Sequence, residues 1–213
     1  MQTFIQNLST VLEIANWIGG ILIAIFAFKG LQQLKIAKDT IAISSKRDAF
    51  KLTADEVSLY LNHVIPLFDA LDERIKNEKI TFFAEAEVKI NEKEIGVNFP
   101  KGEKHIMDLI SIAGEIVKLL NALESFAIYF ISGVASEELA FTSVGTTYCS
   151  SVKKILPVIV LLNDNKKNYK NLLKLFYLWN SRLEKLDLLN NKKAIEKKLK
   201  SLSDTSITPI GVK

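Results

Sequence analysis

The chain has 213 residues, a single cysteine and a formal net charge of +4 at pH 7. One cysteine excludes an intrachain disulfide, which suits a reducing cytosol. The charge is unevenly divided, because residues 29–150 carry 14 Lys/Arg against 18 Asp/Glu, whereas residues 151–213 carry 14 against 5. This basic C-terminal part indicates an anionic partner, although a lysine-rich surface that only keeps the domain soluble has the same composition.

The first element is an uncharged apolar run from Ile14 to Phe28, followed directly by Lys29. A helix needs ~20 residues to cross a hydrocarbon core of about 30 Å, and the apolar residues before Ile14 supply the missing turns. The pattern therefore predicts a transmembrane segment over residues 1–29, with the span at about residues 8–28. A cleaved secretory signal would need a positive n-region and a small-residue cleavage site, which are missing, and a buried core helix is the other alternative.

The orientation of this span follows from its flanking charges. Residues 1–28 contain no Lys or Arg, whereas five lie on the C-terminal side between Lys29 and Arg47. Cations near the end of a span stay on the cytoplasmic side. We therefore expect a single-pass membrane protein with its N-terminus outside and everything after Lys29 in the cytoplasm.

One face of the predicted span carries small and polar residues at steps of three and four. Small residues let helices approach closely, and polar residues avoid lipid by facing another helix or water. The pattern predicts a homo-oligomer, with a pore or a tight helix interface formed by Glu13, Asn16, Gly20, Ala24 and Ala27. A plain anchor with an incidental asparagine is the alternative.

The rest of the chain reads as a mainly helical domain. Residues 30–76 predict a long connecting helix, kinked or broken near Pro66 and ending about Lys76. Residues 77–104 are rich in β-branched and aromatic residues and predict a small β-hairpin with its turn at residues 91–94, although the first half also suits a helix. Residues 105–203 predict the helices of a sensor or interaction domain, and residues 204–213 predict a mobile tail.

Several helix boundaries within residues 105–203 are readable. The sequence predicts a helix from about His105, broken near Gly114 and capped by Gly133. A second helix starts after Ser136 and runs toward Val152 with an interruption at Gly145. A separate piece covers residues 153–165, and a strongly amphipathic helix buries Leu172, Leu175, Phe176, Trp179 and Leu183.

The inventory of chemically reactive groups predicts no enzyme, no metal site and no cofactor. The two histidines, His63 and His105, and the lone Cys149 have no metal-ligand spacing, and no glycine-rich phosphate loop occurs. Glu115 and Glu124 lie on an apolar helix, where capping or pairing with a lysine from a neighbouring helix is the common role.

Basic residues interleaved with aromatics suggest recognition of a nucleotide or a single strand instead. The predicted anionic-ligand site consists of Lys153, Lys154, Lys166, Lys167, Tyr169, Lys170, Lys174 and Arg182. A second basic group, from Lys192 to Lys200, could instead lie against anionic lipid headgroups.

The segments LLNALESFAIYFISGVASEELAF, VKKILPVIVLLND and YKNLLKLFYLWNSRLEK together resemble a group of bacterial single-span membrane proteins of unassigned function. The resemblance rests mainly on packing positions such as Asn121, Glu124, Gly133 and Trp179. It implies an all-helical cytosolic bundle and brings no catalytic residues.

The overall layout also resembles membrane effectors of antiphage systems, in particular the Hailong type. That resemblance implies a homo-oligomeric channel, with a tetramer favoured, whose cytosolic helical domain senses an oligonucleotide or nucleotide made by a partner nucleotidyltransferase. The alternative function is a non-conducting, membrane-tethered interaction or scaffold protein.

Overall fold

The structure is a computed structural model that describes residues 2–90, 95–163 and 168–202; for residues 2–15, 18, 21, 22 and 24 it describes only the helical backbone. The chain divides into two compact units, Met1–Ala49 and Phe50–Lys213, each of which is described by itself. The first unit is helical throughout its described residues. The predicted tail at residues 204–213 lies outside the described residues.

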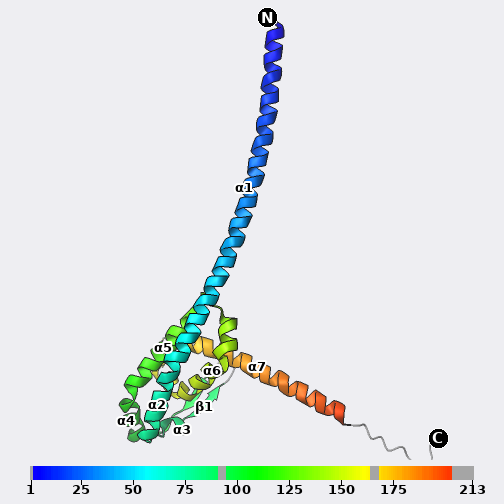
Figure 1. Cartoon of the computed structure of the whole chain (residues 1–213). Helices are drawn as coiled ribbons and strands as arrows, with labels where there is room; N and C mark the ends of the chain where they lie inside the picture. Colours follow the sequence, from blue (N-terminus) through cyan, green and yellow to red (C-terminus); the bar gives the residue numbers. More distant parts are fainter. Residues whose placement is uncertain (1, 91–94, 164–167, 203–213) are drawn as a thin grey trace, which may run out of the picture. The chain divides into compact units, whose positions relative to one another are not determined.

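The described part of the chain is mainly helical with one small sheet, so the predicted mainly α fold with a β-hairpin is confirmed. Figure 1 labels most of the elements, which in chain order are α1 (Gln2–Leu59), the π-helix η1 (Tyr60–Val64), α2 (Ile65–Asn77), α3 (Phe82–Glu85), β1 (Glu87–Ile90), β2 (Ile95–Asn98), α4 (Glu103–Ser111), α5 (Ala113–Ile131), α6 (Glu137–Leu162) and α7 (Lys170–Ser201).

The helix that starts as α1 changes its hydrogen-bond pattern next to Pro66. The amide of Ile65 donates to the carbonyl of Tyr60, which widens the turn to a π-helix. Because proline has no amide hydrogen and its ring presses on the carbonyl four residues earlier, a widened turn accommodates Pro66 where a regular helix would not. The wide turn also places Tyr60 in the core with none of its surface exposed.

The two strands pair antiparallel, with Val88 opposite Val97 and Lys89 opposite Gly96. The predicted turn at residues 91–94 lies outside the described residues. Within the first half of the predicted hairpin segment, residues Phe82–Glu85 form the short helix α3 instead of a strand. The alternative helical interpretation of this half allowed such a helix. This local helix buries the Phe82 ring, which contacts Phe83 edge-on and stacks with Phe99.

The predicted boundaries around α5 are close to the observed ones. The break between α4 and α5 falls at Ile112, two residues before Gly114, because the Ile112 side chain is fully buried at the corner. Gly133 adopts φ +76° just after α5 and donates its amide to the carbonyl of Phe130. Only glycine takes this left-handed conformation without strain, so Gly133 ends the helix as expected.

The predicted division of α6 near Val152 is wrong, because one helix runs from Glu137 to Leu162 through both Gly145 and Pro157. A proline inside a helix removes one hydrogen bond and usually kinks it. Here Leu156, Val158 and Ile159 are all buried, so the packing around the proline outweighs the lost bond.

The core of the second unit gathers around α7. Four of the five predicted core residues of this helix, Leu172, Leu175, Phe176 and Trp179, are fully buried, whereas the fifth, Leu183, is only partly buried beside them. Aromatic rings from α5 and α6 surround Trp179, with the ring centroids of Tyr148 and Trp179 5.0 Å apart. The second basic group, from Lys192 to Lys200, lies on the same helix, since α7 continues to Ser201.

Gly145 provides a test of this packing. A Cβ atom at Gly145 would lie 2.6 Å from Cδ2 of Phe141, one turn earlier on α6. Overpacking costs about 1–3 kcal/mol, more than the ~0.5–1 kcal/mol that alanine gains over glycine in a helix. We expect Gly145→Ala to lower the free energy of unfolding, measured by denaturant titration.

The matched control is Gly114→Ala, because nothing lies within 4 Å of a Cβ atom at Gly114. This variant should be neutral or slightly more stable than the parent. Equal effects of the two substitutions would show that Phe141 is not held where the structure places it.

Candidate functional site

The predicted pore or interface residues lie on one continuous helix. Glu13, Asn16, Gly20, Ala24 and Ala27 all belong to α1, and steps of three and four residues put them on a common face. Asn16, Gly20 and Ala27 are exposed, and nothing lies within 4 Å of a Cβ atom placed on Gly20. This face therefore has room for a closely packed second helix.

Large apolar side chains of α1 are also exposed. Among the described residues, Trp17 is 77%, Ile23 70% and Phe26 69% exposed, and the exposed series continues through Ile43. Apolar surface in water is costly at about 25 cal/mol per Å². Such a long exposed apolar series is typical of a surface covered by lipid or by another protein.

Among the described residues, one helix is long and apolar enough to cross a membrane, and it is α6. An apolar window of 18 residues in α6 is 56% buried inside the second unit. Its side chains build the core there, as the sequence analysis expected for residues 155–162. We therefore interpret α6 as a core helix.

The described residues of the predicted anionic-ligand site lie on or next to two helices, α6 and α7. Some of them already contact other residues of the chain. Lys154 on α6 donates to Asp72 at 2.8 Å, and Tyr169 precedes α7 and packs against the core. Lys153, Lys170 and Lys174 are exposed, whereas Lys166 and Lys167 lie outside the described residues.

Arg182, the last of the predicted ligand residues, has two internal partners. Its guanidinium donates to Oε2 of Glu137 at 3.0 Å and lies 4.5 Å from the centre of the Phe141 ring. The other carboxylate oxygen of Glu137 accepts a hydrogen bond from the indole of Trp179. Arg182 therefore ties α7 to the start of α6, and using it for a ligand would break this link.

Glu124 fastens the N-terminal end of α7. Its carboxylate accepts hydrogen bonds from the amide of Leu172 at 2.8 Å and from the side chain of Asn171 at 2.8 Å. These contacts satisfy donors that a helix N-terminus leaves unpaired, and the negative charge suits the helix dipole. The capping role that was predicted for Glu124 is therefore confirmed.

A second polar cluster joins the end of α2 to the corner between α4 and α5. The guanidinium of Arg74 donates to Glu78 at 2.7 Å, to the carbonyl oxygen of Ser111 at 2.7 Å and to Glu115. The hydrogen bond from Arg74, followed by one from the Ser111 hydroxyl, lowers the pKa of Glu78. Sequence reasoning anticipated a cation for Glu115 but could not find Arg74, which lies 41 positions earlier.

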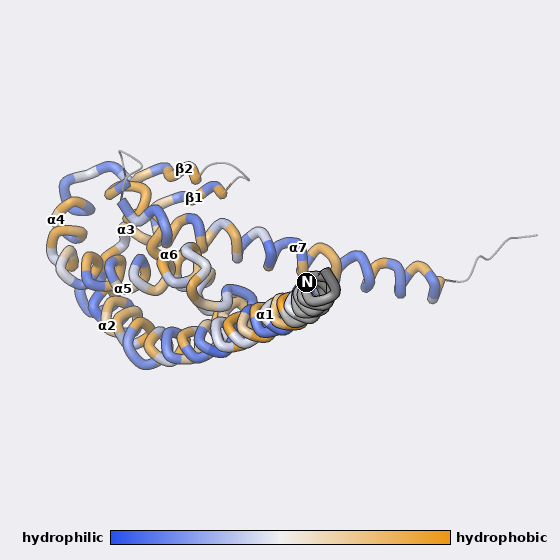
Figure 2. The backbone as a smooth tube through the Cα atoms, turned by 90° about the horizontal axis from the view of Figure 1, so that it is seen from above, coloured by the Kyte–Doolittle hydropathy of each residue, from blue (hydrophilic) through white to orange (hydrophobic). Residues whose placement is uncertain are grey.

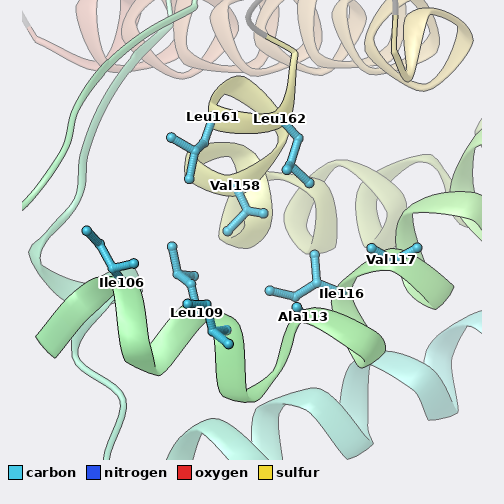
Figure 3. A pocket seen from close by; sticks show the side chains of 9 residues that line it. Ile106, Leu109, Ala113, Ile116, Val117, Val158, Leu161 and Leu162 are labelled. Carbon is cyan, nitrogen blue, oxygen red and sulfur yellow. The ribbon is translucent and has the colours of Figure 1, made fainter. Parts of the chain in front are cut away.

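An apolar cavity of about 280 Å³ lies between α4, α5 and the end of α6 (Figure 3). No sequence pattern indicated it. Its lining contains no charged or polar side chain, and consists of Ile106, Leu109, Ile110, Ala113, Ile116, Val117, Val158, Leu161 and Leu162. At the α4 side of the cavity, Ile106 is 61% and Ile110 64% exposed. The cavity can hold an apolar group but offers no catalytic chemistry.

Cys149 and His105 are among the reactive side chains that the sequence analysis considered. Cys149 is buried, and burial raises the pKa of its thiol to about 12, so the nucleophilic thiolate is disfavoured. Nε2 of His105 lies 3.3 Å from a carboxylate oxygen of Glu85. No group of His, Cys, Asp and Glu within the described ranges could hold a metal ion.

Comparison with known proteins places these observations in a family. The family described as "Domain of unknown function (DUF4760)" matches residues 18–179. This range begins inside the apolar stretch of α1 and ends at Trp179, the last fully buried apolar residue of α7. No curated protein and no solved structure matches the chain.

Glu56 allows a test by pH. It is 8% exposed near the end of α1, and burial raises the pKa of its carboxyl above 4.5, more than a hydrogen bond from Tyr129 lowers it. The folded state therefore binds this proton more tightly than the unfolded state does. The resulting stabilisation is full below pH 4.5 and is lost as the pH rises through the folded-state pKa.

We expect Glu56→Gln, which is neutral at every pH, to melt at a higher temperature than the parent at pH 7. This advantage should shrink as the pH falls through the raised folded-state pKa of Glu56, and it should be gone below about 4.5, the ordinary value for the group. Melting curves across this pH range test the expectation, with Glu73→Gln on the exposed side of α2 as the control. An advantage that does not vary with pH would contradict it.

Proposed function

Because the chain belongs to the DUF4760 family, whose function is unknown, we propose a function from the geometry of its two units: a homo-oligomeric, single-span protein of the bacterial inner membrane with a cytosolic helical signalling domain. The observation that carries this proposal is the exposed apolar surface of α1, illustrated by Trp17, Ile23 and Phe26. A lipid bilayer covers such a surface completely, and a span needs about 20 residues of it.

The charges beside the apolar segment support an inward orientation of the domain. Lys29 and Lys35 follow the segment and are exposed, so they are free to meet the cytoplasmic headgroups. The second unit then lies in the cytoplasm. Its lone Cys149 is reduced and buried, which agrees with that compartment.

Self-association is proposed from the small and polar face of α1. In lipid, helices associate by close packing and by hydrogen bonds between polar side chains. Gly20 provides the close approach and Asn16 provides an amide that lipid cannot satisfy. The layout resemblance to channel-forming effectors favours four subunits.

A second candidate function, ion conduction, is favoured by the same face. An acid and an amide within a span usually turn toward a partner helix or a water-filled path. In an oligomer, Glu13 and Asn16 of each copy would line the common axis. The domain would then regulate this path, as the antiphage effectors of similar layout do, in response to an oligonucleotide or nucleotide from a partner nucleotidyltransferase.

Support for that ligand in the second unit comes from Lys153, Lys170 and Lys174, whose exposed side chains are available to phosphates. Lys154 and Arg182 contribute less, because each is paired with a carboxylate. A non-conducting tether that binds another protein uses the same span and domain without this ligand. Electrical measurements on the oligomer separate the two functions.

We predict that Gly20→Leu lowers the association constant of the oligomer about 5- to 30-fold, the effect expected from losing 1–2 kcal/mol of helix–helix interaction in lipid. Cross-linking in native membranes measures the oligomer. The matched control is Gly19→Leu, the same substitution on the neighbouring residue, which helical spacing puts about 100° away from the interface. Equal oligomer in both variants would contradict the proposed interface.

Membrane potential recorded in the same strains tests conduction. If the parent depolarises cells when a signal is supplied and Gly20→Leu does not, the oligomer conducts. If the oligomer forms but the potential never changes, the protein is a tether.

A further inference from the structure

Helix α7 changes character after Leu183. Its first half buries Leu172, Leu175, Phe176 and Trp179 completely. From Glu184 to Leu202 every residue is exposed, and Figure 1 shows this half extending beyond α5 and α6. The second half therefore receives no support from the core of its own unit.

The second half nevertheless carries an apolar stripe of its own. Leu188, Ile195 and Leu199 are spaced by seven and four residues, which places them on one face, and Leu202 follows at the end of the helix. Their exposures are 70%, 60%, 63% and 65%. Figure 2 shows hydrophobic and hydrophilic residues alternating along these turns.

This stripe lies on the side opposite to the core-facing residues. Leu188 lies nine positions after Trp179 on the same helix, which is about two and a half helical turns and therefore half a turn away around the axis. The buried face of the first half and the apolar face of the second half therefore point in opposite directions. A stripe that only continued the core face would not show this reversal, so this apolar face of the second half is available to a partner outside the domain.

The charges around the stripe indicate the chemistry of that partner. Residues 188–202 contain five lysines and one acid, a net charge of +4. Helical spacing puts Lys192 on one side of the stripe and Lys198 on the other. Lys192 lies 3.9 Å from Glu196, a long, exposed contact that leaves most of the positive charge uncompensated.

We propose that the second half of α7 binds an anionic lipid surface, with the stripe of Leu188, Ile195, Leu199 and Leu202 in the acyl boundary and the flanking lysines on the phosphate headgroups. An apolar stripe bordered by lysines on a helix with a charged opposite face is suited to this position. Each lysine near an anionic surface adds affinity. A second copy of the helix fits less well, because two segments of charge +4 repel each other.

The binding surface on α7 is separate from the span on α1, so the two proposals can fail independently. The experiment uses the full chain with vesicles of phosphatidylglycerol or of phosphatidylcholine. Spin labels are attached through Ile195→Cys on the stripe and through Asn190→Cys on the opposite side, and a label through Ile25→Cys reports on α1. Buried Cys149 does not compete for the reagent.

The position of each spin label is read from its collision rates with two reagents. Oxygen concentrates in lipid and collides most with an embedded label, whereas a water-soluble nickel chelate collides most with a label in water. We expect the Ile195→Cys label to be embedded on phosphatidylglycerol and in water on phosphatidylcholine, with the Asn190→Cys label in water on both. Lys192→Gln and Lys198→Gln should each lower the ratio of embedded to exposed label about fivefold, whereas Lys153→Gln on α6 should not.

Two results would overturn the proposal. One is a stripe label that stays in water on phosphatidylglycerol or is embedded equally in both lipids. The other is dipolar coupling between stripe labels in both lipids, which would identify a second copy as the occupant. The Ile25→Cys label reads the span separately, since α1 should be embedded in either lipid.

Discussion

The aromatic cluster around Trp179 is the interaction on which the helical domain depends. Its ring centroid lies 5.0 Å from Tyr148, 6.2 Å from Phe126 and 6.0 Å from Phe130, so α5, α6 and α7 meet on one side chain. The ring of Tyr60, which belongs to the π-helix η1, joins the cluster with its centroid 4.9 Å from that of Phe126. Burial of such large rings supplies much of the hydrophobic free energy of a small domain. The indole N–H of Trp179 donates a hydrogen bond to the carboxylate of Glu137, which holds the ring in place.

This core is complete without the first unit and without the second half of α7. Both of these segments carry exposed large apolar residues, such as Phe26 and Ile195, and both have cations beside them. A hydrophobic stretch that its own domain does not cover needs lipid or another chain. A span together with a basic amphipathic helix would attach the protein to the membrane at two points.

Local patterns were sufficient to predict much of the fold. Gly133 ends α5 because a left-handed helix end depends on a few neighbouring residues, and Ser136 precedes α6 as expected, although its side chain makes no capping hydrogen bond. The continuity of α6 through Pro157 was missed, since burial around the proline decided it. The partners of Lys154 and Arg182 were also missed, because Asp72 and Glu137 lie 82 and 45 positions away and sequence spacing does not specify such pairs.

The central claim, that the apolar part of α1 crosses a bilayer, is tested most directly by alkaline carbonate extraction of membranes from cells that produce the full chain. High pH releases proteins held by lysine–phosphate contacts, so α7 alone would not retain the protein. We predict that the protein stays in the membrane pellet and is released only by detergent. Complete release into the carbonate supernatant as a folded, non-aggregated protein would contradict the claim.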